Sequence, residues 1–296
     1  MALIIILYVF FGTRTSQRDM YVDRTEGRLI DALPEGEPCF INVAPGLRFR
    51  VDTGSDISYI TERDLALLDS LGYKIEEKIY PVIGRNTLGD IDYAVKRYTV
   101  DFPAYCWTTD SVSVPIEETK NVFHNVDFAL SPTDFSVLGI DFLEHFKIEH
   151  RTGENHVAFY KDDTPEGYEE CQAVKRKGGL LIWPLLGKRY YLNMAVAHTA
   201  NDFFIDTGMR VAFMKQPYDD ADNSIIAYED TTMSSYINTF PAKVDKNCWI
   251  QIGQRQGKSF VYYFDNEEED YSTNPVNMLN YSMVLDFPNR RLLFRK

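Results

Sequence analysis

Short apolar stretches, each bounded by polar, glycine or proline-containing turns, recur along most of the chain and predict β-strands. One arrangement of them occurs twice. Residues 40–60 read "FINVAPGLRFRVDTGSDISYI" and residues 194–214 read "MAVAHTANDFFIDTGMRVAFM". In both, a strand-like stretch is followed by a turn, a returning apolar strand, the tripeptide Asp-Thr-Gly and a second apolar stretch. The pattern therefore predicts a β-hairpin that delivers an Asp-Thr-Gly loop, encoded twice.

The two halves also end alike. Residues 136–161 and residues 277–296 each contain a strand, a polar turn and a last apolar strand. Because a repeated pattern of this length indicates two copies of one structural unit, we expect an N-terminal lobe over 16–160 and a C-terminal lobe over 180–296. The polar, glycine-containing segment 161–179 is interpreted as the linker between them.

Helix signals are few. Residues 61–72 ("TERDLALLDSLG") combine an N-cap threonine, an apolar face and a terminal glycine, and residues 139–146 ("GIDFLEHF") could form a second short helix. The predicted fold class is therefore all-β with few short helices.

Composition narrows the range of functions. The net charge is −13 and no basic run is present, which argues against nucleic acid as a partner. The four cysteines form no C-x-x-C pair, and the five histidines are scattered, so no metal site is predicted. One or two disulfides would be compatible with export, but the sequence does not pair the cysteines.

The N-terminal segment 1–15 begins with eleven consecutive residues, from Met1 to Phe11, of mainly apolar character. This run is too short to span a bilayer as it stands. It resembles the apolar core of a signal peptide or an anchor, although it lacks preceding basic residues and a clear cleavage site. We favour export to the periplasm, cell surface or medium; the alternative is an N-terminal strand of a cytoplasmic protein.

The doubled Asp-Thr-Gly, together with "VLGIDFL" at residues 137–143 and the paired closing strands, resembles the aspartic proteases of the pepsin and retropepsin type. The single-chain, two-lobed arrangement is most similar to bacterial retropepsin-like proteins with a duplicated domain. The resemblance implies the acid-protease fold, in which two β-barrel-like lobes enclose a cleft. It also implies a monomer that acts on a polypeptide substrate and needs no cofactor.

The resemblance assigns roles to individual residues. Asp52 and Asp206 would be the catalytic pair, which activates a water molecule for attack on a peptide bond. Two adjacent carboxylates cannot both ionise readily, so the pair would share one proton and titrate as a unit. In the family, the residues that support the active-site loops correspond here to Thr53, Gly54, Ser55, Thr207, Gly208 and Gly139.

A flap over the cleft is also implied. Residues 80–93 ("YPVIGRNTLGDIDY") have strand-like ends and lie at a suitable distance after the first aspartate. We interpret this segment as the flap, with Tyr80 or Tyr93 as its aromatic residue and Gly84 and Gly89 near its turn. The alternative is an ordinary surface hairpin.

The chain departs from the family pattern in two places. Ser55 follows the first Asp-Thr-Gly, and its hydroxyl is expected to bind the outer carboxylate oxygen of Asp52. Met209 occupies the equivalent place after the second and cannot donate, which should raise the pKa of the pair and move activity toward neutral pH. Opposite the apolar-apolar-Gly of residues 137–139, the second half has Thr273, Asn274 and Pro275, so weaker support for its loop is expected.

Three functions remain open from the sequence. The first is an aspartic endopeptidase that uses Asp52 and Asp206. The second is a catalytically weak or inactive relative that binds peptides or proteins, an alternative that Met209 favours. The third, a structural β-protein with chance Asp-Thr-Gly tripeptides, explains the duplicated pattern least well.

Overall fold

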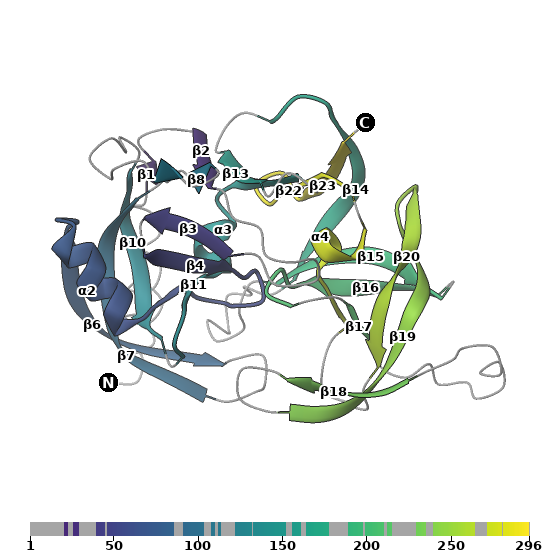
Figure 1. Cartoon of the computed structure of the whole chain (residues 1–296), viewed down its shortest axis with the longest axis horizontal. Helices are drawn as coiled ribbons and strands as arrows, with labels where there is room; N and C mark the ends of the chain where they lie inside the picture. Colours follow the sequence, from purple (N-terminus) through teal and green to yellow (C-terminus); the bar gives the residue numbers. More distant parts are fainter. Residues whose placement is uncertain are drawn as a thin grey trace, which may run out of the picture.

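The chain forms a β-rich protein with two lobes side by side and a sheet that connects them, as a computed structural model shows (Figure 1). The structure describes residues 21–22, 26–29, 40–44, 46–85, 91–103, 108–109, 112–113, 122–131, 133–151, 156–160, 164–177, 189–197, 199–209, 212–214, 229–234, 239–263, 271–279 and 281–295. The predicted all-β fold class is confirmed. The N-terminal segment 1–15, with its expected signal peptide or anchor, lies outside the described residues.

The first lobe is built on a sheet with the strand order β3-β4-β11-β5-β10-β7-β6, and β1 also pairs with β10. These strands are β1 (Tyr21–Val22), β3 (Phe40–Ala44), β4 (Leu47–Val51), β5 (Tyr59–Ile60), β6 (Ile75–Arg85), β7 (Ile91–Pro103), β10 (Val122–Leu130) and β11 (Ser136–Leu138). A separate small ribbon pairs β8 (Thr108–Thr109) with β9 (Val112–Ser113).

The second lobe repeats this strand order. Its strands run β15-β16-β21-β17-β20-β19-β18. They are β15 (Arg189–Val196), β16 (Thr199–Ile205), β17 (Ala212–Met214), β18 (Glu229–Ser234), β19 (Thr239–Ile252), β20 (Arg255–Tyr263) and β21 (Ser272–Thr273). The parallel pairs match as well, because β4–β11 and β5–β10 correspond to β16–β21 and β17–β20. The repeat in the sequence is therefore a repeat of topology.

Six further neighbouring strands join the lobes, at the top of Figure 1. Their order is β14-β23-β22-β12-β13-β2, with three strands from each half. They are β2 (Glu26–Leu29), β12 (Lys147–Arg151), β13 (His156–Tyr160), β14 (Tyr168–Lys177), β22 (Met283–Asp286) and β23 (Arg291–Arg295). The closing hairpins predicted from the sequence are β12–β13 and β22–β23, and they meet where β12 pairs antiparallel with β22.

The segment interpreted as the linker is more ordered than its composition suggests. Residues 168–177 within it form β14, which pairs with β23 and with β15. Its side chains are largely exposed, which explains the polar composition, while its backbone is hydrogen-bonded on both sides. The connection between the lobes is thus a strand of the shared sheet.

Three short helices complete the described structure. Helix α2 (Glu62–Ser70) begins as predicted, because the Thr61 side chain accepts a hydrogen bond from the backbone N–H of Asp64, and it is followed by Gly72 at φ +81°. Helices α3 (Ile140–Leu143) and α4 (Pro275–Met278) each follow the strand beneath an Asp-Thr-Gly loop, β11 and β21. In the described part of the chain, no helix is long and apolar enough to cross a membrane.

Both lobes have an apolar core that supports the central loops. Phe49 of β4 is fully buried and packs at a tilted angle on Phe128, with ring centroids 5.6 Å apart. In the second lobe Phe203 of β16 is fully buried beside Tyr271. Close packing of these buried side chains therefore holds the strands that lead into the two Asp-Thr-Gly loops in place.

Candidate active site

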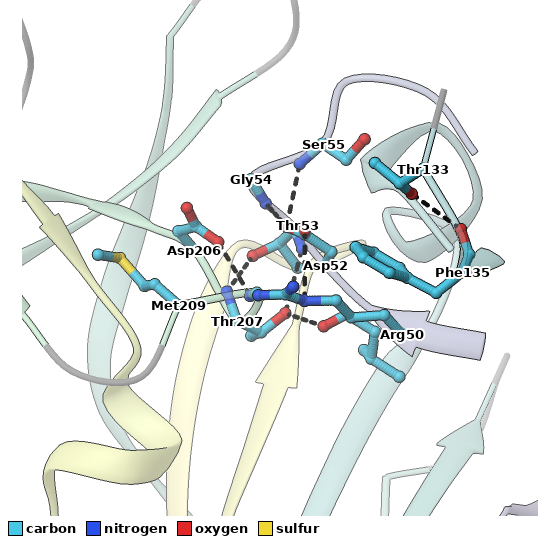
Figure 2. Close-up of polar contacts among 12 residues, drawn as sticks. Arg50, Asp52, Thr53, Gly54, Ser55, Thr133, Phe135, Asp206, Thr207 and Met209 are labelled. Carbon is cyan, nitrogen blue, oxygen red and sulfur yellow. Dashed lines mark hydrogen bonds and ion pairs between the residues drawn. The ribbon is translucent and has the colours of Figure 1, made fainter. Parts of the chain in front are cut away.

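Each Asp-Thr-Gly tripeptide occupies the turn directly after a strand, β4 in the first lobe and β16 in the second. The backbone N–H of Asp52 donates to the carbonyl of Leu138 (3.0 Å), and that of Asp206 donates to the carbonyl of Thr273 (2.9 Å). Neighbouring strands β11 and β21 thus fix both loops in the same way. The two loops meet between the lobes (Figures 1 and 2).

The threonines cross-link the loops. The backbone N–H of Thr53 donates to the Thr207 hydroxyl (3.1 Å), and the N–H of Thr207 donates to the Thr53 hydroxyl (3.0 Å). Each hydroxyl in turn donates across the interface, Thr53 to the carbonyl of Ile205 (2.7 Å) and Thr207 to that of Val51 (2.9 Å). Both threonines are almost completely buried, so these four hydrogen bonds are shielded from water.

The carboxylates reach across to the opposite loops. A Cβ built on Gly54 would collide with the carboxylate of Asp206, and one built on Gly208 would collide with that of Asp52. Glycine is therefore required on steric grounds at both positions. Asp52 is 5% exposed, and a side-chain hydrogen bond connects the two aspartates.

Burial is the largest influence on the pKa of Asp206. Loss of hydration raises the pKa of Asp206 well above its usual range, and the negative charge of Asp52 and their hydrogen bond raise it further. The positive charge of Arg50 and the backbone N–H of Gly208, which lies 2.9 Å from Asp206 Oδ1, act in the opposite direction. The arrangement favours one proton held between two carboxyl groups.

Arg50, which the sequence analysis did not single out, belongs to the site. Its Nε lies 3.8 Å from Asp52 Oδ2, and its guanidinium lies over the ring of Phe135 at 5.7 Å from the centroid (Figure 2). A signal was present in the sequence: residues two apart in a strand project to the same side, so the arginine two positions before Asp52 faces the same way as the carboxylate.

The prediction that the Ser55 hydroxyl binds Asp52 is wrong, because the backbone N–H of Ser55 makes this hydrogen bond instead. The backbone N–H of Ser55 donates to Asp52 Oδ1 (3.2 Å), beside that of Gly54 (2.9 Å), while the Ser55 hydroxyl donates to the carbonyl of Ile57 (2.8 Å). Two backbone N–H groups already donate to Asp52 Oδ1 in this turn, and the Ser55 hydroxyl binds the backbone of its own loop. Ser55 supports the loop, but through its backbone.

Gly139 lies beneath the first loop, as the resemblance implied. A Cβ at this position would lie 2.5 Å from the backbone carbonyl of Ile57 and 2.9 Å from that of Ser55. Its N–H donates to the Ser58 hydroxyl (3.0 Å), and the next N–H, of Ile140, donates to the carbonyl of Ser55 (2.8 Å). The absence of a side chain lets strand β11 approach the loop closely.

Beneath the second loop, the residues that correspond to those of the first half are shifted by one position from the expected correspondence. Since Leu138 and Thr273 accept the equivalent hydrogen bonds from the two aspartates, the residue that corresponds to Gly139 is Asn274, not Pro275. The buried Asn274 amide donates to the carbonyls of Thr207 (3.1 Å) and Met209 (2.7 Å). The expectation of weak support is therefore wrong: an amide clamp takes the place of glycine packing.

The hydrogen bonds to the two carboxylates are unequal. The N–H of Met209 donates to the backbone carbonyl of Asp206 (3.3 Å), whereas the equivalent N–H of Ser55 also reaches a carboxylate oxygen. The Met209 thioether lies on the Asp206 side of the site (Figure 2). Asp52 thus accepts two backbone N–H groups on Oδ1, and Asp206 accepts that of Gly208.

The segment interpreted as the flap is a hairpin of β6 and β7, with Gly84 paired to Asp92 and Tyr93 paired to Ile83. A register irregularity lies between Ile79 and Val82, around Tyr80. The corresponding hairpin of the second lobe is β18–β19. Gly89 lies outside the described residues, and the action of this hairpin as a flap stays a prediction.

Within the described residues, no group of three or more His, Cys, Asp or Glu side chains is arranged to hold a metal ion. Two of the four cysteines are described, and both Cys171 and Cys248 are free thiols. Cys39 and Cys106 lie outside the described residues.

Comparison with known proteins establishes the fold and no more. No family model matches the chain, and no curated protein matches its sequence. Among solved structures, the chain is similar to basic 7S globulin from soybean, with a TM-score of 0.50 over 93% of this chain and 95% of that chain, at 10% sequence identity. At this identity the likeness concerns the architecture of the two chains.

Proposed function

We propose that this protein is an aspartic endopeptidase in which Asp52 and Asp206 activate a water molecule for attack on a peptide bond. The observation that carries the proposal is the pairing of two carboxyl groups, one from each lobe, on loops locked together by the reciprocal hydrogen bonds of Thr53 and Thr207. A structural role alone would not require two buried, mutually repelling acids in equivalent turns.

The chemistry follows from the protonation state of the pair. The ionised carboxylate removes a proton from the water as the oxygen attacks the carbonyl carbon, and the protonated partner donates its proton to the carbonyl oxygen. The raised pKa of Asp206 makes it the better candidate for the protonated partner. Collapse of the tetrahedral species then breaks the carbon–nitrogen bond: the carboxyl group that took the water proton gives it to the leaving amine, and a hydroxyl of the tetrahedral carbon returns its proton to the other carboxylate.

The second candidate function is binding of peptides or proteins without cleavage. The specific observation that favours it is Met209, because its side chain cannot donate a hydrogen bond at the position after the second glycine. A binding protein of this kind would need the lobes and the space between them but not a reactive pair. The intact Thr53–Thr207 cross-link and the Asn274 clamp favour the endopeptidase, since both hold the reacting groups in place.

The test is proteolysis of a denatured protein mixture between pH 3 and 8 by the full chain, with Asp52→Asn as the matched variant. The endopeptidase predicts cleavage by the parent and a loss of about 1,000-fold or more in the variant, since the water loses its base. Cleavage by neither protein, combined with saturable binding of the same substrates, would establish the binding function instead. Equal cleavage by both would refute the assignment of Asp52.

A further inference from the structure

Arg50 places a buried positive charge beside one member of the aspartate pair. Strand β4 alternates between the core and the opposite side: Phe49 and Val51 are fully buried in the core, while Arg50 lies on the other side, where Asp52 follows. The side chains of Arg50 and Asp52 are only 12% and 7% exposed. A charge contact at this depth is screened far less by solvent than one at the surface.

The guanidinium is held in place from its other side. It lies over the Phe135 ring, 5.7 Å from the centroid, an arrangement that favours a planar cation. The Phe135 backbone is fixed in turn, because its carbonyl accepts hydrogen bonds from the hydroxyls of Ser131 (2.9 Å) and Thr133 (3.2 Å). Arg50 is thus positioned between an aromatic ring and a carboxylate (Figure 2).

The two oxygens of Asp52 face different partners. Oδ1 accepts the N–H groups of Gly54 and Ser55, and Oδ2 is the oxygen closest to Arg50. Backbone N–H groups and a guanidinium beside a carboxyl group favour negative charge at that place. Asp206 accepts the N–H of Gly208 and shares a hydrogen bond with Asp52, and Met209 stands where the first loop has Ser55. The surroundings of the pair are therefore asymmetric.

We propose that Arg50 is a positioning residue that holds the negative charge of the pair on Asp52 and leaves the shared proton on Asp206. The kinetic consequence rests on the proposed endopeptidase function; the location of the proton does not. Within the described part of the chain, Arg50 of β4 is the cation beside the pair, and each aspartate also faces the other. Asp56, further along the first loop, interacts with Arg189 and Asp141.

The variant that tests this is Arg50→Gln, with Arg50→Lys to restore the charge and Arg48→Gln as the matched control. Arg48 projects from the same strand to the same side but lies two residues further from Asp52. An opposite charge at this range shifts a carboxyl pKa by about one to three units. We therefore expect the acidic limb of the kcat/KM profile to move up by about that amount in Arg50→Gln, by less than half as much in Arg50→Lys, and by a few tenths in Arg48→Gln.

A second measurement needs no activity. In the full chain with ¹³C-labelled aspartate carboxyl groups, assigned through Asp52→Asn and Asp206→Asn, the signal of Asp52 at pH 5 should be that of a carboxylate and the signal of Asp206 that of a carboxylic acid. The reverse assignment, or an unchanged acidic limb in Arg50→Gln, would overturn the proposal. A parent that cleaves nothing would refute the endopeptidase, while the same carboxyl signals compared between the parent and Arg50→Gln still decide the role of Arg50: an unchanged Asp52 signal at pH 5 in the variant would overturn it.

Discussion

The carboxylate of Asp206 lies against Gly54, the glycine of the opposite loop, and Asp52 lies against Gly208 in the same manner. Each loop therefore shapes the space that the other loop's acid occupies. A change of one glycine should act on the carboxylate of the other lobe.

Gly54→Ala tests this relationship. The added methyl group would occupy the position of the Asp206 carboxylate, so the loops must separate and the two acids lose their alignment. A displacement of about 1 Å can cost on the order of 100-fold in rate, and we expect a loss of kcat/KM of at least this size. Gly257→Ala is the control, since its methyl group would meet only the flexible end of Leu279 at 3.0 Å. Equal activity in both variants would contradict the prediction.

The threonine cross-link should contribute to stability as well as to geometry. Thr53→Ala removes the hydrogen bond to the carbonyl of Ile205 and leaves the N–H of Thr207 without its acceptor in a buried place. We expect each of Thr53→Ala and Thr207→Ala to lower the free energy of unfolding by about 2 kcal/mol, measured by urea denaturation. The double variant should lose less than the sum, because both changes break the same network.

Thr133→Ala serves as the control for that series, since it also removes a hydroxyl that donates to a backbone carbonyl but lies outside the cross-link. Strict additivity of the two cross-link variants would mean that the four hydrogen bonds act independently, against the prediction.

Glycine at the equivalent position of the first lobe, Gly139, would suggest that Asn274→Gly is harmless, but the hydrogen bonds of Asn274 predict a loss of stability. Replacement by the residue found at the equivalent position of the first lobe, Asn274→Gly, removes both donors to the second loop and the acceptor for the N–H of Val276. The variant should therefore lose about 2 to 3 kcal/mol in the free energy of unfolding. Retention of full stability in thermal denaturation would show that close packing, not the amide, supports this loop.

Asp56 predicts a pH dependence of stability. Burial is the largest cause that raises its pKa to about 6, the charge of Asp141 adds to it, and Arg189 counteracts it. Between about pH 4 and pH 6 the folded protein binds a proton at Asp56 that the unfolded chain releases. Protonated Asp56 therefore contributes its full share to the free energy of unfolding below about pH 4, and this share is lost as the pH rises through about 6.

Asp56→Asn should remove that loss. We expect the variant to gain roughly 2 kcal/mol relative to the parent between pH 4 and pH 7, after allowance for the partial exposure of the group, in urea denaturation at each pH. Asp69→Asn, on the exposed side of α2, is the control for removal of one negative charge. A constant difference between Asp56→Asn and parent across this range would contradict the assignment.

The sequence predicted most of the fold because its strongest signals repeat. Asp52 and Asp206 stand at the same place in two copies of one hairpin pattern, and the repeated strand order of the lobes agrees with that duplication. Thr61 and Gly72 bracket α2, since capping is a local interaction that a short stretch of sequence encodes.

The parts that the sequence did not predict depend on contacts between distant residues. The register beneath the second loop was misassigned because Asn274 replaces glycine packing with an amide clamp, which no local pattern distinguishes from an ordinary helix cap. The polar side chains of residues 168–177 suggested a linker, although their backbone completes a sheet. The position of Arg50 depends on Phe135, which comes from a separate loop.

The pairing of β12 with β22 affects how the protein must be made. Strand β12 is complete once residue 151 has been synthesised, but the strand that covers its edge is formed by residues 283–286, which are synthesised only after the strands β14 to β21. An uncovered strand edge can pair with other chains. Until β22 has been synthesised, the nascent first lobe therefore has an unpaired strand edge, and a chaperone or rapid synthesis of the second lobe would protect it from aggregation during translation.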